Sequence, residues 1–266
     1  MRQLVQAAIL FPETLGFRDG SASVHTSRTM MLDELSLVIE KVGPAARAND
    51  YVAAIVEENA LGKPTQSTRQ RTAKRLRELY ALDPRCTLFR RLRHFWTGVP
   101  AGRPMLAFLA AAARDPLLRE TTPFMLSLRE GESVDAGEIS EHLRQAYPAR
   151  FAATTLHSTA QNLASTWTQA GYLRGKVKKC RSHPHVPPVV AAFAVLLGYL
   201  CGLRGKLLLD STWTRLLDRS PVALSDLMIE ASRQGWLNYK AAGNVVEITF
   251  PGLLKPPEEK AADEQN

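Results

Sequence analysis

Apolar residues recur three or four positions apart along most of this chain, a spacing that places them on one face of an α-helix. The segment MLDELSLVIEKV at 31–42 is typical, and Gly43-Pro44 ends it. Glycine, proline or capping residues separate the other segments of this kind. Helices are therefore predicted over 31–42, 51–61, 65–81, 86–97, 103–113, 115–128, 135–147, 154–170, 188–203, 207–218 and 222–234. The expected fold is mainly α, a compact multi-helix protein.

The C-terminal part departs from this helical spacing. NYKAAGNVVEITF at 238–250 alternates apolar and polar residues on both sides of an Ala-Gly-Asn turn, which predicts a short β-hairpin. The residues that follow, KPPEEKAADEQN at 255–266, are polar and are predicted to form a disordered tail.

One local pattern occurs twice. WTQAGYLRG at 167–175 and ASRQGWLNYK at 231–240 each run from a helix through a glycine into an aromatic-Leu pair. Winged-helix modules pass from their third helix to the wing in this way, although a glycine C-cap before a core aromatic is the simpler interpretation of each copy. We therefore expect winged-helix-like units at about 154–186 and 207–250, within a helical region 104–254 that follows an N-terminal helical region 1–103.

The most apolar segment is VVAAFAVLLGYLCGL at 189–203. It has fifteen residues, while a membrane span needs about 20, so a buried core helix is favoured over a membrane anchor. The first twenty residues contain no sustained apolar run, which argues against a signal peptide. Three cysteines without CxxC pairing are typical of a reducing compartment, so the expected location is cytoplasmic.

No motif of a catalytic or cofactor site is present in the sequence. The glycine-rich phosphate loops, the zinc-protease helix and the nucleophile elbow all lack a match. Cys180, His183 and His185 lie close together, but no second Cys or His cluster follows at zinc-finger spacing. We therefore predict a protein that is not an enzyme, with no catalytic residues, no metal site and no cofactor.

Basic residues are concentrated in two blocks. Residues 61–103 carry 11 basic and 2 acidic side chains, and residues 151–206 carry 7 basic and none acidic, while the rest of the chain is mildly acidic. Clustered cations are the electrostatic feature that binds a polyanion, because each phosphate contact releases condensed counterions. A solvated basic face is the alternative. Two such blocks favour a nucleic-acid partner.

The first block centres on the helix predicted over 65–81. Ala73, Leu76 and Leu79 fall on its buried face, and the cations fall on the opposite face. Some of these arginines can pair with nearby glutamates instead, but the block holds too few acids to neutralise them. The candidate phosphate contacts of this block are Arg69, Arg71, Lys74, Arg75, Arg77, Arg90, Arg91 and Arg93.

In the second block, the helix TTLHSTAQNLASTWTQAG at 154–171 has an exposed face without charge. Ser158, Gln161 and Asn162 on that face carry hydroxyl and amide groups of the kind that read base edges. The wing would then place cations along the phosphates, namely Arg174, Lys176, Lys178, Lys179 and Arg181. An ordinary polar surface helix followed by a solvated loop is the alternative interpretation.

Two motifs resemble the BrxA family of BREX bacteriophage-resistance systems. The first is the Asn-Leu helix end followed by a Ser-Thr-Arg basic helix, and the second is a Ser-Thr helix closing in Ala-Gly-Tyr-Leu. The matching residues are Asn59, Leu61, Ser67, Thr68, Arg69, Arg75, Leu76, Ser158, Thr159, Ala170, Gly171, Tyr172 and Leu173. The resemblance implies a small, non-enzymatic, helical DNA-binding protein that accompanies a larger defence machinery. It also implies likeness to the RNA-binding helical bundle NusB.

The sequence thus predicts an accessory protein of a phage-defence system that binds duplex DNA mainly through phosphates. Two alternatives stay open: an adaptor that joins other defence proteins, and a transcriptional regulator of its own operon. The last predicted helix carries Asp226 and Glu230, which disfavour phosphate contact. We expect this C-terminal unit to be structural or to contact protein, and we expect no membrane partner.

Overall fold

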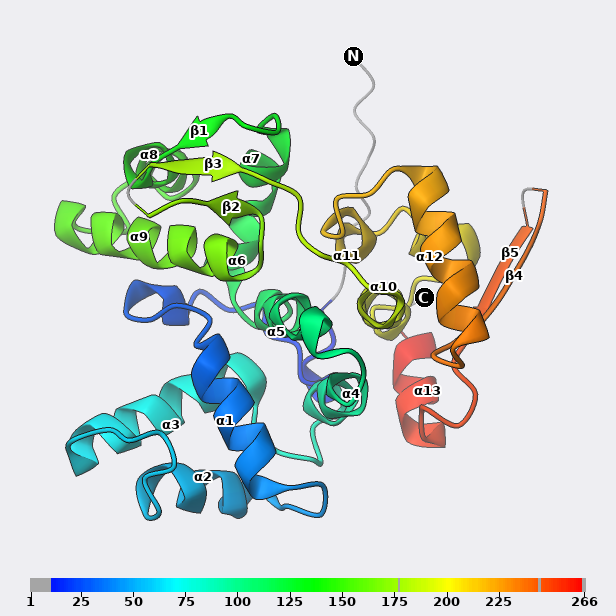
Figure 1. Ribbon diagram of the computed structural model, residues 1–266, viewed down its shortest axis with the longest axis horizontal. Coiled ribbons are helices and arrows are strands. Elements are labelled where there is room, and N and C mark those ends of the chain that lie inside the picture. The colour runs from blue at the N-terminus through cyan, green and yellow to red at the C-terminus, as the bar shows by residue number, and fades with distance from the viewer. Residues whose placement is uncertain (1–10, 177, 244, 265–266) are drawn as a thin grey trace.

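Helix α5 (Arg103–Ala112) lies at the centre of the molecule (Figure 1), and its residues from Met105 to Ala112 are all buried. The computed structural model describes residues 11–176, 178–243 and 245–264. It shows a mainly helical protein with two small β-sheets. Both predicted regions contribute to one hydrophobic core, which extends from Leu15 to Ala262. The prediction of a mainly α, multi-helix fold is confirmed.

The N-terminal region packs below α5 in Figure 1. Its described part begins with two short 3₁₀ helices, and α3 ends at Tyr80, after which Ala81 adopts a positive φ of 65°. The elements are η1 (Glu13–Leu15), η2 (Val24–Thr26), α1 (Leu32–Val42), α2 (Ala48–Val56), α3 (Gln66–Tyr80), α4 (Thr87–Trp96) and η3 (Pro100–Gly102).

After α5 the chain forms the first winged-helix-like unit. The elements run α6 (Pro116–Glu120), α7 (Thr122–Ser127), β1 (Ser133–Val134), α8 (Ala136–Ala146), α9 (Ala153–Gln169), β2 (Leu173–Arg174) and β3 (Lys179–Arg181). The strands form an antiparallel sheet in the order β1-β3-β2, with Ser133 opposite Cys180 and Leu173 opposite Arg181. A helix, a strand, two helices and a hairpin follow one another here. The unit therefore begins well before residue 154, where the sequence placed it.

A second unit repeats this order without a first strand. It comprises α10 (Pro188–Leu200), η4 (Gly205–Leu208), α11 (Thr212–Arg215), α12 (Pro221–Arg233), β4 (Asn238–Ala242) and β5 (Val245–Thr249). The two strands pair antiparallel from Asn238–Thr249 to Ala242–Val245, so the predicted hairpin is confirmed, although Asn244 of its turn lies outside the described residues. In both units a glycine with positive φ follows the helix that precedes the hairpin, Gly171 (92°) after α9 and Gly235 (78°) after α12.

Helix α10 holds the second unit against the rest of the core. It packs against α4, α5, α12 and α13, and its residues from Val189 to Gly198 are buried. This explains the apolar segment that the sequence assigned to the core. Over the described parts of the chain, no helix combines the length and the apolar character that crossing a membrane requires.

The prediction of a disordered tail is wrong for residues 256–263, which form helix α13 (Pro256–Asp263); residues 265–266 lie outside the described residues. Glu258 in its first turn is buried and accepts a hydrogen bond from Thr87 Oγ1 at 2.8 Å. The same carboxylate pairs with Arg90 and, at 3.2 Å, with Arg91. A polar segment is ordered here because its acid neutralises two arginines of α4.

Candidate nucleic-acid interface

Helices α8 and α9 form a helix-turn-helix. The Asp135 carboxylate caps α8 by accepting hydrogen bonds from the amides of Gly137 (2.7 Å) and Glu138 (3.1 Å), and Glu138 completes the capping box. The chain then turns through Ala149 (φ 58°) and enters α9. This turn brings the two helices together. In DNA-binding helix-turn-helix proteins the second helix of such a pair enters the major groove.

The buried stripe of α9 is the one that the sequence predicts. Leu156, Ala160, Leu163, Ala164 and Trp167 are all buried. The Trp167 indole N–H donates to Thr121 Oγ1 at 3.0 Å, which fixes the helix against the end of α6. Because this face is occupied, the opposite face of α9 is presented to solvent.

The hairpin of β2 and β3 that follows α9 is the wing of this unit. The exposed face of α9 and the wing line one cavity of about 630 Å³. His157, Gln161 and Ser165 line it from α9, at four-residue intervals, and Lys176 and Lys179 line it from the wing. Asp135 is the one carboxylate in the lining, and its side chain is engaged in capping α8. The structure thus combines uncharged hydrogen-bonding groups with two cations, as the sequence predicts for this pair of elements.

The wing cations differ in how free they are. Arg174, Lys176 and Lys178 are exposed, and none of them has a carboxylate partner among the described residues. Lys179 is partly buried and donates to Thr168 Oγ1 at 2.9 Å, and burial lowers the pKa of its ammonium. Lys179 therefore holds the wing against α9, while the other three cations remain available to an anion.

Arg181 does not belong to the interface. Its side chain is buried, it pairs with Asp218 at 2.6 Å, and it donates to the carbonyl of Met125. Asp218 lies between α11 and α12, so Arg181 joins the two winged-helix-like units. The prediction of a phosphate contact at Arg181 is wrong because Asp218 already neutralises it.

Two of the three predicted base-reading residues on α9 have other partners. Asn162 Nδ2 donates to the backbone carbonyl of His25 at 2.9 Å, and Ser158 Oγ donates to the carbonyl of Thr155 at 3.0 Å. Both side chains are only partly exposed, so Ser158 and Asn162 are left out of the candidate face described below. Gln161 is exposed and lies 3.1 Å from His157 Nε2, which adds His157 to the candidate face.

A buried polar cluster fixes α9 to the N-terminal segment. His25 and Asp115 are both at most 1% exposed, with Nδ1 3.0 Å from Oδ2, and His25 Nε2 lies 2.9 Å from Thr166 Oγ1. Asp115 also accepts hydrogen bonds from Ser23 and from the backbone of Val24. Burial raises the pKa of Asp115, but the charge of His25 and these hydrogen bonds outweigh burial and hold it at about 2.

On α3 the buried face matches the prediction, with Ala73, Leu76 and Leu79 in the core. Arg71, Lys74 and Arg77 are exposed and have no carboxylate partner among the described residues. The other two candidates of this helix are engaged. Arg69 donates to the carbonyl of Val56 at 2.7 Å, and Arg75 pairs with Glu78 at 2.7 Å.

The prediction of phosphate contacts on α4 is wrong for Arg90 and Arg91, because Glu258 neutralises both, and Arg93 is engaged with backbone and with an aromatic ring. Arg90 and Arg91 pair with Glu258, and burial together with the charge of Arg90 lowers the pKa of Arg91 to about 10. Arg93 donates to the carbonyl of Gly43 at 2.8 Å and lies over the ring of Tyr51. These side chains hold α13 and the α1–α2 connection in place.

The sequence analysis missed Arg28. This exposed side chain follows η2, which packs against both α9 and α3, and it has no carboxylate partner among the described residues. It therefore lies between the two basic blocks. No sequence signal marks it, because residues 1–60 carry 8 acidic and only 5 basic side chains.

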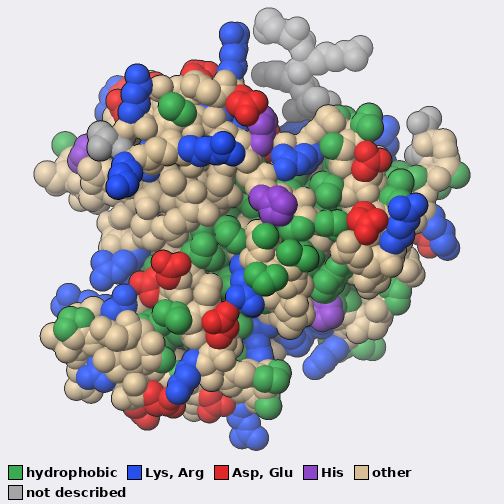
Figure 2. Space-filling model, viewed as in Figure 1, with side chains coloured by type: hydrophobic (Ala, Val, Ile, Leu, Met, Phe, Trp, Pro, Cys, Tyr) green, Lys and Arg blue, Asp and Glu red, His purple; other side chains and the backbone are tan. Residues whose placement is uncertain are grey.

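Together these groups make up what we call the basic edge: Arg28, Arg71, Lys74, Arg174, Lys176 and Lys178, with His157 and Gln161. Helices α9 and α3 both extend toward the same side of the molecule, with η2 between them (Figure 1). Figure 2 shows a notch on that side, with Lys and Arg side chains on both rims.

The motif residues that resemble BrxA also have structural roles. Asn59 adopts φ 51° and its Oδ1 accepts a hydrogen bond from the Lys63 amide, and Tyr172 is fully buried. Neither a scan against protein-family models nor a search of curated proteins finds a match to this chain. The resemblance therefore stays a prediction.

Proposed function

We propose that the chain is a non-enzymatic protein that binds double-stranded DNA along the basic edge, mainly through phosphates. The observation that carries the proposal is the shared cavity between the uncharged face of α9 and the wing cations. In this arrangement the cations position the duplex, and Gln161 and His157 lie where a groove would present base edges. On the resemblance to BrxA, the protein would be an accessory of a phage-defence system of the BREX type.

Arg28 provides a sharp test, because it was found from the structure and not from the basic blocks. Arg28→Gln is expected to weaken duplex binding about 5- to 10-fold at 0.1 M salt and to reduce the salt slope by about 1. Fluorescence anisotropy of a labelled duplex measures both. The matched control is Arg215→Gln, an exposed cation on α11 of the second unit that does not belong to the basic edge. Equal losses in the two variants would mean that net charge, and not the basic edge, determines binding.

A second candidate is an adaptor that contacts protein through the second unit. Val222 and Ile229 on α12 are 73% and 42% exposed, and Val245 on β5 is 71% exposed, so this unit presents apolar groups to solvent. Competition separates duplex DNA from an acidic protein as the partner of the basic edge. Unlabelled duplex should displace labelled duplex, whereas polyglutamate at equal charge should not. Equal displacement by polyglutamate would favour an acidic protein as the partner of the basic edge.

A further inference from the structure

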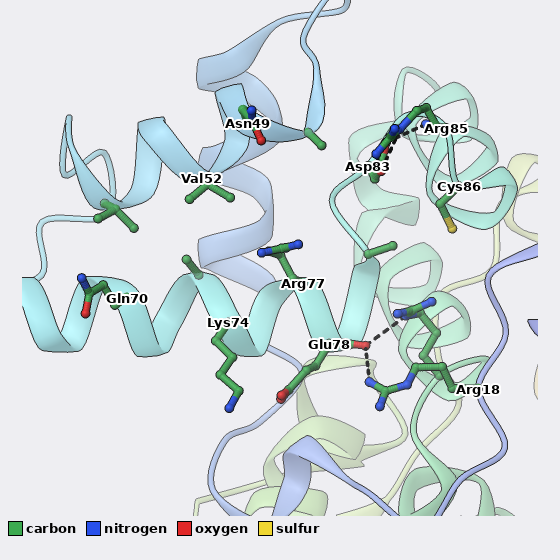
Figure 3. Close-up of a pocket in the computed structure, with 15 residues that line it drawn as sticks. Arg18, Asn49, Val52, Gln70, Lys74, Arg77, Glu78, Asp83, Arg85 and Cys86 are labelled. Carbon is green, nitrogen blue, oxygen red and sulfur yellow. Dashed lines mark hydrogen bonds and ion pairs between the residues drawn. The ribbon is translucent and has the colours of Figure 1, made fainter.

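A cavity of about 760 Å³ lies between α2, α3 and the turn that leads into α4 (Figure 3). Ala48, Asn49 and Val52 line it from α2, and Arg77 points into it from α3. Lys74, one turn earlier, also contributes to the lining, but its side chain points away from α2. A smaller cavity of about 310 Å³ continues from it and shares Asp83 and Arg85. The volume is within the range of small-molecule sites.

The charges that line this cavity are unbalanced. Arg18, Arg77 and Arg114 have no carboxylate partner among the described residues. The two acids of the lining are both engaged, Asp83 with Arg85 at 2.8 Å and Glu78 with Arg75 at 2.7 Å. Three guanidinium groups therefore remain for an anion from outside the protein.

Two of these arginines are held in position by one backbone oxygen. Arg114 Nε donates to the carbonyl of Glu78 at 3.0 Å, and Arg18 donates to the same oxygen at 3.4 Å (Figure 3). Arg114 also donates to the carbonyl of Gly16. Burial lowers the pKa of Arg114, and the nearby charge of Arg18 lowers it further. Two like charges that share one acceptor are stabilised when an anion binds between them.

The remaining wall is apolar. Val52, Val56, Ala73 and Ala81 lie around the guanidinium groups. The α2 helix also begins at this cavity, since Ala48 and Asn49 are its first two residues, and a helix N-terminus favours negative charge. A ligand with a dianionic end and a less polar body fits both parts of the lining.

We infer that this cavity binds a phosphate monoester, with Arg18, Arg77 and Arg114 on the phosphate and the apolar wall against the attached sugar or base. The planar guanidinium fork matches phosphate oxygens in pairs, which a lysine does not. A free mononucleotide and the 5′-phosphate of a DNA strand share this chemistry. Lys74 of the basic edge also lines the cavity, but the three arginines assigned to the phosphate do not belong to that surface.

Thermal unfolding of the full chain tests the site at constant ionic strength, with the mononucleotide dAMP, inorganic phosphate and the nucleoside deoxyadenosine as probes. At about 100 times its Kd, dAMP is expected to raise the Tm by roughly 5–10 °C. Inorganic phosphate should raise it less, and deoxyadenosine should leave it unchanged. No shift with dAMP and phosphate, or an equal shift with deoxyadenosine, would overturn the inference.

Arg77→Gln is expected to weaken dAMP binding about 10- to 100-fold, because it removes a charged donor from the phosphate. Arg77 is exposed and has no carboxylate partner among the described residues, so the variant should fold. Arg215→Gln, at an exposed cation outside both the cavity lining and the basic edge, is the matched control and should bind dAMP as the parent does. Unchanged dAMP affinity in Arg77→Gln would refute the assignment.

The source of the phosphate can be separated with one duplex in two forms. If a strand end is the ligand, the parent should bind the 5′-phosphorylated duplex more tightly than the 5′-hydroxyl form, and Arg77→Gln should not distinguish them. If dAMP binds and the two duplexes are equal, the ligand is a free nucleotide. The dAMP result does not depend on whether the chain binds duplex DNA.

Discussion

Replacing Arg174, Lys176 and Lys178 together with glutamine is expected to weaken duplex binding about 10²- to 10³-fold at 0.1 M salt. All three are exposed on the wing beside α9 and lack a carboxylate partner among the described residues. Each phosphate contact contributes about 0.9 to the slope of log affinity against log salt, so three contacts contribute about 2.7. Anisotropy titrations at several salt concentrations give both the affinity and the slope.

The matched control for this variant removes the same charge elsewhere. Arg215, Lys240 and Arg233 are exposed cations of the second unit, and the last two lie near Glu247 and Glu230. Replacing these three with glutamine should weaken duplex binding at least tenfold less than the wing variant does. Equal losses would show that the wing has no special place in binding.

Asp115→Asn is expected to lower the free energy of unfolding by about 3 kcal/mol or more, which corresponds to a fall in Tm of roughly 6–12 °C. The substitution removes the charge that faces buried His25 and places an amide N–H₂ among groups that donate to Asp115, including the Val24 and Leu118 amides. Denaturant unfolding measures the effect. Asp210→Asn, at an exposed carboxylate, should change stability by no more than about 0.5 kcal/mol.

The same carboxylate predicts a dependence on pH. The pKa of Asp115 is about 2 in the folded protein, below its ordinary value of 3.8, so the stability it contributes is present above about pH 4 and is lost as the pH falls toward 2. Asp115→Asn should therefore show a shallower loss of stability than the parent over this interval. Parallel pH profiles for the two proteins would contradict the role assigned to the His25–Asp115 pair.

Local patterns predicted most helices and their buried faces, but the helix predicted over 115–128 divides into α6 and α7, and the one predicted over 207–218 is wrong, because only η4 and the four-residue α11 form there. The buried stripes of α3 and α9 follow from apolar spacing, and the glycines after α9 and α12 indicated where each helix ends. The sequence also predicted that the basic residues after Gly171 lie on a wing, because they follow the glycine that ends α9. All of these features depend on residues within about one or two turns of each other.

The errors came from partners that lie far away in the sequence. Arg181 pairs with Asp218, 37 residues later; Asn162 donates to His25, 137 residues earlier; and Arg91 pairs with Glu258, 167 residues later. A cation that is neutralised by a distant acid has the same sequence pattern as a free one. Contacts between distant residues also explain two omissions. The polar composition of residues 255–266 did not indicate helix α13, and nothing in the sequence around Arg28 indicated that it lies between the two basic blocks.

The most direct test of DNA binding along the basic edge is the affinity of the parent protein for labelled duplex between about 50 and 200 mM salt. The six exposed cations of the basic edge predict a slope near −5 in log affinity against log salt, or a loss of about 10³-fold over this range. The expected result is a salt dependence of this steepness in the parent protein and a shallower slope in the variant with the three wing substitutions. A slope shallower than about −1, or no binding at 50 mM salt, would contradict a phosphate-based interface.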